Sequence, residues 1–402
     1  MTRGWFSQAG LTRLHEVMAG HVERDDMPGS IALVARHGRA HVDVIGTRTF
    51  GDAEPLQHDD VFRMTSMTKP ITAAAVMALV DDGTLHLDAP VDDLLPELAN
   101  RRVLRSIDAR LDDTVPAKRS ITLEDLLTFR LGLGMVFAQT PYPIVEAEKE
   151  LQLATLSPPY PPSPHSTDEW LRRLGTLPLI SQPGEQWIYN TGAQVLGAVL
   201  ERATGKSLDV VLHERILGPL GMGDTAFTVS PAMKGRLTTA YEVDWQTGEL
   251  AVLDGVEGGY WSRPLAFPSA SAWLLSTIDN YWTFVRMLLN GGAHDGGRIL
   301  SKESVVRMTT DHLESSQRAF ASPFLGDTEG WGYCMAAPAS GADHGTIPRG
   351  FGWAGGAGTS WRSDVDADLT GILFTQRAMG SPQAAEVYAD FWKAAYAAID
   401  AD

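Results

Sequence analysis

The sequence has very little cysteine and lacks long apolar segments. Its 402 residues include a single cysteine, Cys334, so no disulfide can form within the chain. No acid–base partner lies near Cys334 in sequence, which favours a small buried apolar side chain over a nucleophile. No segment approaches the roughly 18 apolar residues that a membrane helix needs, and no signal peptide follows Met1. We therefore expect a cytoplasmic protein that does not associate with membranes.

The chain is also short of basic residues and of several well-known motifs. It has 33 Lys and Arg against 50 Asp and Glu, a formal net charge of -17. Nucleic acids and anionic lipids bind to basic surfaces, so neither is an expected partner. Cys-x-x-Cys, His-Glu-x-x-His and phosphate-binding glycine loops are missing, so we expect no metal and no cofactor. The Gly-x-Ser-x-Gly elbow of α/β-hydrolases is missing as well.

What the chain does contain is an ordinary globular composition, with 44% hydrophobic and 21% charged residues. Apolar periodicity and turn residues predict a series of helices and strands. The predicted helices span residues 11–24, 64–80, 121–127, 192–204, 208–217, 273–289 and 384–399, and the predicted strands span 31–35, 40–45 and 369–375.

Strands lie at both ends of the chain and helices dominate its middle. This order predicts an α/β (α+β) fold in which residues 1–65 and 225–402 form a sheet domain. Residues 66–224 would form an inserted, mainly helical domain, with the functional site between the two. Prolines interrupt residues 140–165, and a loop of this length is usually functional or disordered. Because Tyr142 and Tyr160 lie among the prolines, we expect an ordered loop rather than a linker.

The most informative motif is Ser66-Met67-Thr68-Lys69, a Ser-x-x-Lys at the start of a predicted helix. Residues three apart share one face of a helix, so the hydroxyl of Ser66 and the amine of Lys69 can meet. A serine needs a neighbouring base to act as a nucleophile, and burial turns a lysine into a base by lowering its pKa. The residues after Lys69 are almost all apolar, which indicates that its side chain is drawn inward.

Two further segments contain candidate site residues. Tyr189 lies in Trp187-Ile188-Tyr189-Asn190, where a loop meets the next predicted helix; its hydroxyl can transfer a proton, or it is a core tyrosine with a satisfied hydroxyl. Residues 352–361 are rich in glycine. Such a strand can approach a ligand closely and offer a backbone N–H to an oxyanion, or it is a glycine-rich turn.

Together these segments resemble the serine β-lactamase and penicillin-binding-protein superfamily, for which Ser-x-x-Lys is a known signature. The nearest branch is the class C β-lactamases with the family VIII carboxylesterases, and the resemblance covers nearly the whole chain. Further blocks match in order at residues 82–91, 121–128, 183–185, 219–222 and 288–292. The resemblance implies a β-lactamase-like fold, with an antiparallel sheet flanked by helices and an inserted helical domain.

The resemblance also implies catalytic roles. Ser66 would be the nucleophile, and Lys69 would be its hydrogen-bonded base or relay. Tyr189 matches the tyrosine that passes a proton between nucleophile and leaving group. The backbone N–H groups of Ser66 and Gly356 would form the oxyanion hole.

The binding residues depart from the class C β-lactamase pattern. Where those enzymes have Lys-Thr-Gly, this sequence has Trp353-Ala354-Gly355, which removes the cation and the hydroxyl that hold a β-lactam carboxylate. The esterase branch has Trp-Gly-Gly there, which is similar. The asparagine expected two residues after the tyrosine is shifted by one, to Asn190. We expect Trp353, Gly355 and Asn190 to line the site, and Trp353 to make it aromatic.

These departures favour a serine hydrolase that cleaves small neutral carboxylic esters through a Ser66 acyl-enzyme. The oligomeric state and the natural substrate are left open. So are three alternative functions: an acyltransferase that uses the same acyl-enzyme, a β-lactamase or D-amino-acid peptidase, and a catalytically silent binding protein on the same fold. Residues 129–132 and 268–273 also differ from the family pattern, which predicts altered packing near the site.

Overall fold

Both ends of the chain build one central sheet. The structure is a computed structural model that describes residues 5–137, 142–156, 161–244, 246–326, 328–339, 349–380 and 386–400. Within these residues the sheet has seven antiparallel strands in the order β11-β12-β13-β14-β15-β1-β2. They are β1 (Gly29–Arg36), β2 (Arg39–Gly46), β11 (Glu329–Trp331), β12 (Ala336–Pro338), β13 (Phe351–Gly355), β14 (Thr359–Asp364) and β15 (Leu369–Thr375).

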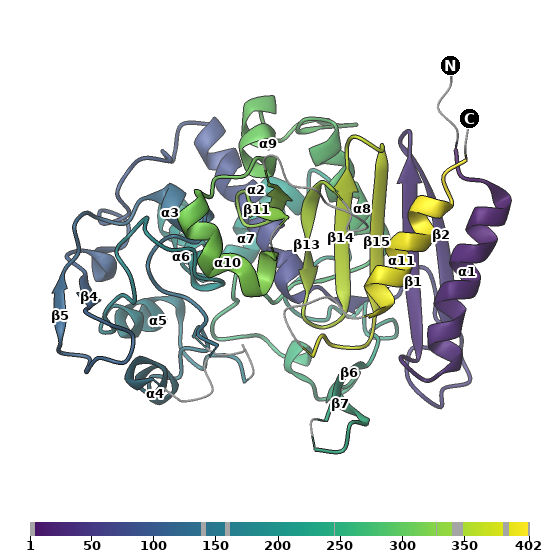
Figure 1. Cartoon of the computed structure of the whole chain (residues 1–402), viewed down its shortest axis with the longest axis horizontal. Helices are drawn as coiled ribbons and strands as arrows, with labels where there is room; N and C mark the ends of the chain where they lie inside the picture. Colours follow the sequence, from purple (N-terminus) through teal and green to yellow (C-terminus); the bar gives the residue numbers. More distant parts are fainter. Residues whose placement is uncertain are drawn as a thin grey trace.

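Helices cover both faces of this sheet because successive side chains along a strand point to opposite sides. Along β1, Ile31 and Leu33 join the large core cluster, whereas Ala32 and Val34 join a second cluster. The second cluster is formed with α1 (Gln8–Glu23) and α11 (Glu386–Ala397), which lie side by side over the β15-β1-β2 half (Figure 1). The large cluster contains α2 (Thr68–Asp81) and α8 (Ile278–Leu289).

The middle of the chain forms the other half of the molecule, beyond the β11 side of the sheet (Figure 1). Its elements are η2 (Pro96–Leu98), β4 (Arg102–Leu104), β5 (Thr114–Pro116), α3 (Leu123–Leu127), α4 (Pro143–Glu150), α5 (Thr167–Leu174), α6 (Thr191–Thr204), α7 (Leu208–Leu212) and η3 (His213–Leu217). The predicted fold class, a β-lactamase-like antiparallel sheet with helices and a mainly helical middle, is confirmed. The proposed domain boundaries at residues 65 and 225 stay a prediction.

The other elements are three strand pairs and four helices of the described residues. The strand pairs are β3 (Phe62–Arg63) with β8 (Leu275–Ser276), β6 (Ala240–Val243) with β7 (Leu250–Asp254), and β9 (Ala293–His294) with β10 (Gly297–Arg298). The remaining helices are η1 (Thr65–Met67), η4 (Tyr260–Ser262), α9 (Lys302–Thr309) and α10 (Ser315–Leu325). The pairing of β3 with β8 places the segment before α2 against the segment before α8.

Two sequence predictions differ from the structure. The helix predicted over 273–289 begins only at Ile278, because Thr277 caps it by accepting the N–H of Asn280. The residues just before Thr277 form strand β8 instead. A short apolar run is compatible with either a helix or a strand. The predicted loop over 140–165 contains α4, which Pro143 can begin because the first helical N–H needs no acceptor; residues 140–141 and 157–160 lie outside the described residues.

Candidate active site

Ser66 lies on η1, the short turn between β3 and α2. Thr65 before it has a positive φ of 40°, which is strained for a β-branched residue, and its Oγ1 accepts the N–H of Ala357 at 3.2 Å. On the other side of this contact, a Cβ on Gly355 would lie 2.2 Å from the carbonyl oxygen of Met64. Only glycine therefore lets the end of β13 come this close to the turn that carries Ser66.

Lys69 is enclosed because α2 is buried on almost every side, from Thr68 to Leu79. The Lys69 side chain is 0% exposed. Its Nζ lies 3.0 Å from Ser66 Oγ and donates to the carbonyl oxygen of Ser271 at 2.8 Å. Burial lowers the pKa of Lys69 to about 7, although the interaction with Cys334 acts in the opposite direction. The expected inward position of this lysine is confirmed, and a large share of it is neutral near pH 7.

Tyr189 completes a short chain of polar groups. Tyr189 is 6% exposed, and its hydroxyl interacts with Ser66. The indole Nε1 of Trp353 donates to the Tyr189 hydroxyl at 2.8 Å. Burial raises the pKa of Tyr189 well above its ordinary value, although the interactions with Ser66 and Trp353 act the other way. Because an indole can only donate, the phenol oxygen accepts from Trp353 and its own proton is free to point toward Ser66.

Three of the predicted residues therefore meet around one oxygen atom. Ser66 has near it an amine of lowered pKa and a phenol that stays protonated, and the Lys69 Nζ also lies 4.6 Å from the centroid of the Tyr189 ring. This arrangement can remove a proton from the serine and supply one to a group that departs from it.

Gly356 follows the last residue of β13 and is exposed. Its carbonyl oxygen accepts the N–H of Met379 at 2.8 Å, and a Cβ added to Gly356 would meet open space. Within the described part of the chain, the backbone N–H groups of Ser66 and Gly356 have no acceptor. Two unpaired amides beside a nucleophile are the chemistry that an oxyanion hole requires.

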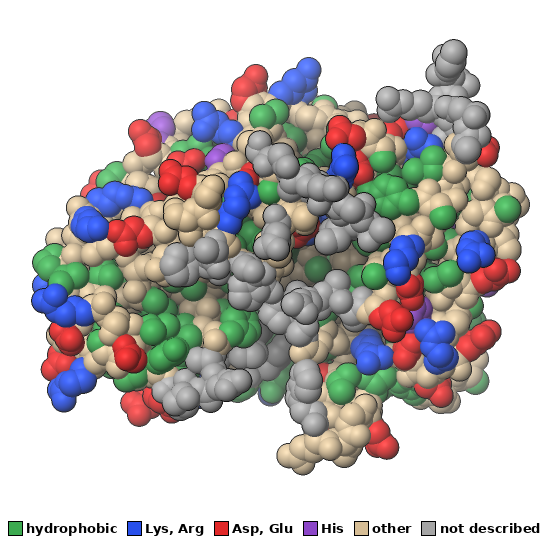
Figure 2. Space-filling view, viewed as in Figure 1, with side chains coloured by type: hydrophobic (Ala, Val, Ile, Leu, Met, Phe, Trp, Pro, Cys, Tyr) green, Lys and Arg blue, Asp and Glu red, His purple; other side chains and the backbone are tan. Residues whose placement is uncertain are grey.

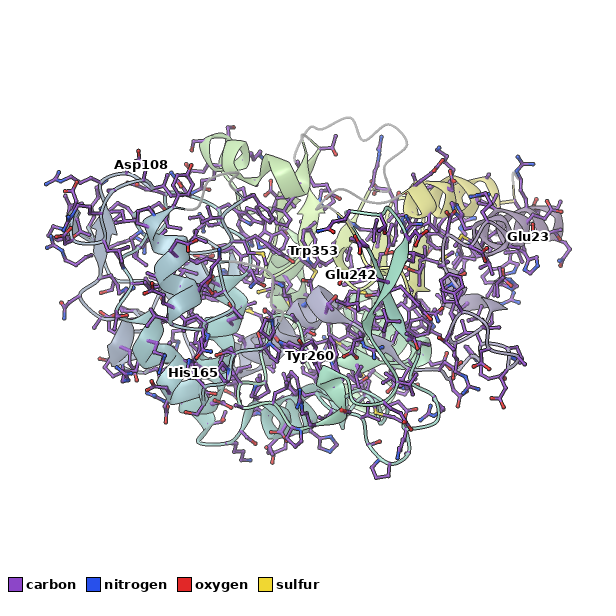
Figure 3. All side chains as sticks on the ribbon, turned by 90° about the horizontal axis from the view of Figure 1, so that it is seen from below. Glu23, Asp108, His165, Glu242, Tyr260 and Trp353 are labelled. Carbon is purple, nitrogen blue, oxygen red and sulfur yellow. The ribbon has the colours of Figure 1, made fainter. Side chains whose placement is uncertain are left out.

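Trp353 and Asn190, which the sequence predicts to line the site, are both buried. Trp353 is only 7% exposed and lies near the middle of the molecule, between the helical half and the sheet (Figure 3). Its indole contacts Tyr189, and its expected place in the wall of the substrate site stays a prediction. Asn190 has a φ of 86° at the start of α6, is buried, and donates from Nδ2 to Gln194 Oε1 at 3.4 Å. Its side chain is thus turned toward its own helix.

Residues 270–274 hold the start of α2, including Lys69, and no motif in the sequence indicated this role. The carbonyl oxygens of Ser271 and Ala270 accept from Lys69 Nζ and from Thr72 Oγ1, both at 2.8 Å. The N–H of Leu274 donates to Thr68 Oγ1 at 3.0 Å. Residues 268–273, which depart from the family pattern, therefore run beside the start of α2 and orient its lysine. Backbone carbonyls carry no residue-type signal, so only the departure itself marked this segment.

Aromatic rings surround Tyr189 on several sides. Phe129, with a positive φ of 58°, packs against it with ring centroids 5.7 Å apart, and Phe324 of α10 lies closer, at 4.3 Å. Trp187 and Trp331 complete this aromatic cluster at 5.7 and 6.3 Å. The departure at residues 129–132 thus places a phenyl ring beside the tyrosine. The cluster excludes water from the phenol and explains the raised pKa of Tyr189.

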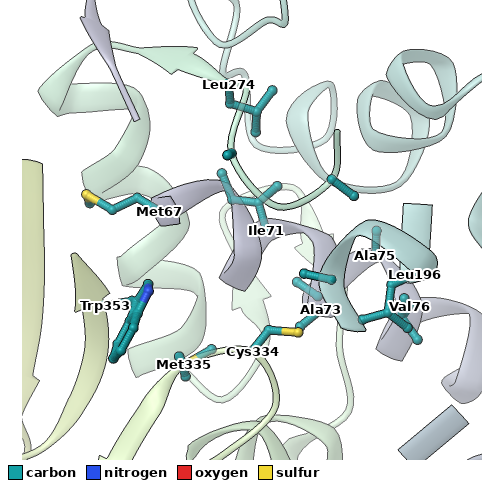
Figure 4. Packing of buried hydrophobic residues seen from close by; sticks show 14 of the residues in the cluster. Met67, Ile71, Ala73, Ala75, Val76, Leu196, Leu274, Cys334, Met335 and Trp353 are labelled. Atoms are coloured by element: carbon teal, nitrogen blue, oxygen red, sulfur yellow. The ribbon is translucent and has the colours of Figure 1, made fainter. Parts of the chain in front are cut away.

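Three further observations concern Cys334, metal binding and membrane helices. Cys334 is buried, with its sulfur pointing toward Ala73 of α2 (Figure 4), which confirms the small apolar interpretation. The described residues contain no group of three or more His, Cys, Asp or Glu that could hold a metal. Among the same residues, no helix is both long and apolar enough to cross a bilayer. The cytoplasmic location stays a prediction.

A hollow opens at the centre of the face shown in Figure 2, in front of the end of β13. An antiparallel sheet with helices on both faces, and a Ser-x-x-Lys serine on η1 against the end of β13, define the class of acyl-serine enzymes with the β-lactamase fold. Residues 14–393 match the family model "Beta-lactamase". The chain belongs to this family.

Curated relatives cover most of the chain. The protein Rv1367c of Mycobacterium tuberculosis is 38% identical over 360 residues, which is 87% of this chain and 86% of the relative. Esterase EstB of Burkholderia gladioli is 31% identical over 391 residues, which is 91% of this chain and 90% of the relative. A matched lovastatin esterase of Penicillium rubens is 31% identical over 350 residues, 81% of this chain and 82% of the relative.

Solved structures support the fold independently. The unliganded selenomethionyl simvastatin synthase LovD from Aspergillus terreus superposes with a TM-score of 0.79 at 24% identity, covering 97% of this chain and 99% of the other. EstCE1, described as a hydrolase with promiscuous acyltransferase activity, superposes with a TM-score of 0.77 at 23% identity, covering 97% and 99%. At this level of identity the likeness concerns the fold.

Proposed function

We propose that the protein is a carboxylesterase that hydrolyses small neutral esters through an acyl-enzyme on Ser66. The observation that carries the proposal is the arrangement around Ser66 Oγ. An amine with a pKa of about 7 lies 3.0 Å away, and the buried phenol of Tyr189 interacts with the same serine. The names of the relatives, Esterase EstB and lovastatin esterase, support ester substrates.

In the proposed reaction, neutral Lys69 accepts the proton of Ser66 while Oγ attacks the ester carbonyl carbon. The negative charge that develops on the carbonyl oxygen is held by the N–H groups of Ser66 and Gly356. When the bond to the alcohol breaks, Tyr189 gives its proton to the departing oxygen and regains one from protonated Lys69. A water molecule then enters where the alcohol left, and the same proton transfers in reverse release the acid.

The test is to trap the acyl group. The protein is mixed with a nitrophenyl ester of a short acid, quenched, and examined by intact mass spectrometry and peptide mapping. We expect one acyl group on the peptide that contains Ser66, and none in Ser66→Ala. Ser271→Ala is the matched control, because its backbone and not its hydroxyl contacts Lys69, and it should still acylate. An adduct that persists in Ser66→Ala contradicts the proposal, and so does a native protein that never acylates, as expected of a silent binding protein.

Acyl transfer to an alcohol is a second candidate, favoured by the aromatic cluster around Tyr189. Those rings restrict the access of water to the Tyr189 phenol. The same phenol would have to activate the alcohol that accepts the acyl group, so less water there favours transfer over hydrolysis. A relative of this chain, from Aspergillus terreus, is named monacolin J acid methylbutanoyltransferase; it is 29% identical over 249 residues, 58% of this chain and 56% of the relative. Product analysis with and without an added alcohol separates the two reactions.

β-Lactamase or D-amino-acid peptidase activity is less favoured by the same residues. Trp353 stands where class C β-lactamases have the lysine of Lys-Thr-Gly, and its indole N–H is already engaged by Tyr189. A carboxylate on the substrate would find no cation at this position. Efficient turnover of a chromogenic cephalosporin would contradict this interpretation of Trp353.

A further inference from the structure

Two phenylalanines connect Tyr189 to the protein surface. Phe324 of α10 contacts the Tyr189 ring with centroids 4.3 Å apart and planes at 33°, and it contacts Phe137 edge-on at 5.2 Å. Phe324 is partly buried, whereas Phe137 is 59% exposed. Phe137 is thus an exposed apolar side chain that reaches Tyr189 through Phe324.

The segments that carry the two rings each contact neighbouring parts of the helical half. The N–H of Met135 donates to the carbonyl oxygen of Tyr189 at 2.8 Å, so the segment that carries Phe137 is fastened to the tyrosine itself. Gln317 of α10 donates from Nε2 to the carbonyl oxygen of Gly184 at 2.7 Å. Phe324 also packs edge-on against Trp187 at 5.6 Å. These contacts tie the segments that carry the two rings, which we call the Phe137–Phe324 pair, to the neighbourhood of Tyr189.

The proposed reaction tells the two ends of an ester apart. The carbonyl oxygen must reach the amides of Ser66 and Gly356 at the end of β13, and the alcohol oxygen must reach the hydroxyl of Tyr189. Whatever is bonded to the alcohol oxygen then lies on the Tyr189 side of Ser66. Among the rings that contact the Tyr189 ring, Phe324 leads outward, through Phe137, to the surface.

We propose that the Phe137–Phe324 pair is the alcohol subsite and makes the enzyme select esters of aromatic or bulky apolar alcohols. This inference rests on the proposed esterase function. The rings supply edge-on and offset stacking to an aromatic alcohol and remove its apolar surface from water. By microscopic reversibility, the same subsite receives an acceptor alcohol when the acyl group is transferred.

The test uses two series of esters, one that varies only the alcohol and one that varies only the acid. In the alcohol series, acetates of ethanol, butanol, benzyl alcohol and 2-naphthylmethanol vary the alcohol among primary alcohols of similar acidity. In the acyl series, ethyl esters from acetate to octanoate vary only the acid. We expect Phe324→Ala and Phe137→Ala to lower the ratio of kcat/KM for benzyl over ethyl acetate by about tenfold, the scale of discrimination in an apolar pocket. The acyl-chain preference should stay as in the native protein.

Phe137→Ala should fold like the native protein, because that side chain is mostly exposed, so its effect on the alcohol preference can be interpreted even if Phe324→Ala is unstable. Phe324→Leu keeps the apolar contact and should restore part of the preference, and Val306→Ala, which removes an exposed apolar side chain on α9, should change neither series. Transfer of the acetyl group to benzyl alcohol over ethanol should fall by the same factor as the hydrolysis ratio.

Two results would overturn the subsite. One is an unchanged alcohol preference in both alanine variants, and the other is a shift in acyl-chain preference without a shift in alcohol preference. Each can occur while Ser66 still forms an acyl-enzyme, so they refute the subsite and leave the esterase proposal standing. Failure of the native protein to acylate on Ser66 refutes the esterase proposal, and the subsite with it.

Discussion

Lys69 determines the pH at which the proposed chemistry can start. Its amine must be neutral to accept the proton of Ser66, and burial lowers its pKa to about 7. We expect kcat/KM for a neutral ester to rise as the pH increases through about 7 and to level off above it. Tyr189 stays protonated over this range because burial raises its pKa. Ethyl acetate hydrolysis, followed in a pH-stat on both sides of neutrality, measures the profile.

Lys69→Arg is the informative variant for this profile, because a guanidinium does not lose its proton in this range. Its rate should fall by about 10²–10⁴, the usual contribution of general acid–base catalysis. A flat pH profile in the native protein, or an arginine variant with nearly full activity, would show that another group accepts the serine proton.

Trp353 is expected to act through Tyr189. Trp353→Phe keeps most of the ring but loses the N–H that donates to the phenol at 2.8 Å. That hydrogen bond strengthens as negative charge develops on the phenol oxygen, so we expect kcat to fall about tenfold with little change in KM. Single-turnover acylation measures the step. Trp331→Phe is the matched control from the same cluster, because its Nε1 has no partner among the described residues; an equal loss in both variants would point to packing alone.

At the scale of elements, the contact between β13 and η1 positions the nucleophile. Gly355→Ala would place a Cβ 2.2 Å from the carbonyl oxygen of Met64, and a backbone group cannot move aside cheaply. We expect Tm to fall by several degrees, since overpacking costs about 1–3 kcal/mol, and acylation to slow because Ser66 moves away from the strand. Gly356→Ala is the control for stability, because the space beyond its Cα is open. Equal Tm values for the two variants would contradict a tight contact at Gly355.

The elements also show which parts of the site a sequence can predict. Ser66 and Lys69 are predictable because their spacing depends only on the helical repeat, and Tyr189 because family blocks occur in a fixed order. The carbonyl oxygen of Ser271 could not be predicted, since any residue provides one. Phe324 could not be predicted either, because its contact with Tyr189 depends on how α10, from a distant part of the sequence, packs against the helical half.

At the scale of the whole molecule, the sheet that unites the two chain ends was predictable from the order of strands and helices. The extent of α8 was not, because residues 273–277 are apolar enough for either a helix or a strand. What decides between them is the pairing of β8 with β3, a long-range contact that local patterns do not contain.

The net charge of the whole molecule should add to the preference for neutral esters. A formal charge of -17 produces a negative field that lowers the local concentration of anionic substrates. We expect kcat/KM for monoethyl succinate to rise about threefold between roughly 10 mM and 500 mM salt, since screening shortens the reach of this field. Diethyl succinate, the matched neutral ester, should change little.

If monoethyl succinate is equally slow at every salt concentration, the discrimination against anions comes from the site, where Trp353 replaces a cation. If salt lowers its rate, basic groups near the site attract the anion, and the net charge does not govern substrate choice.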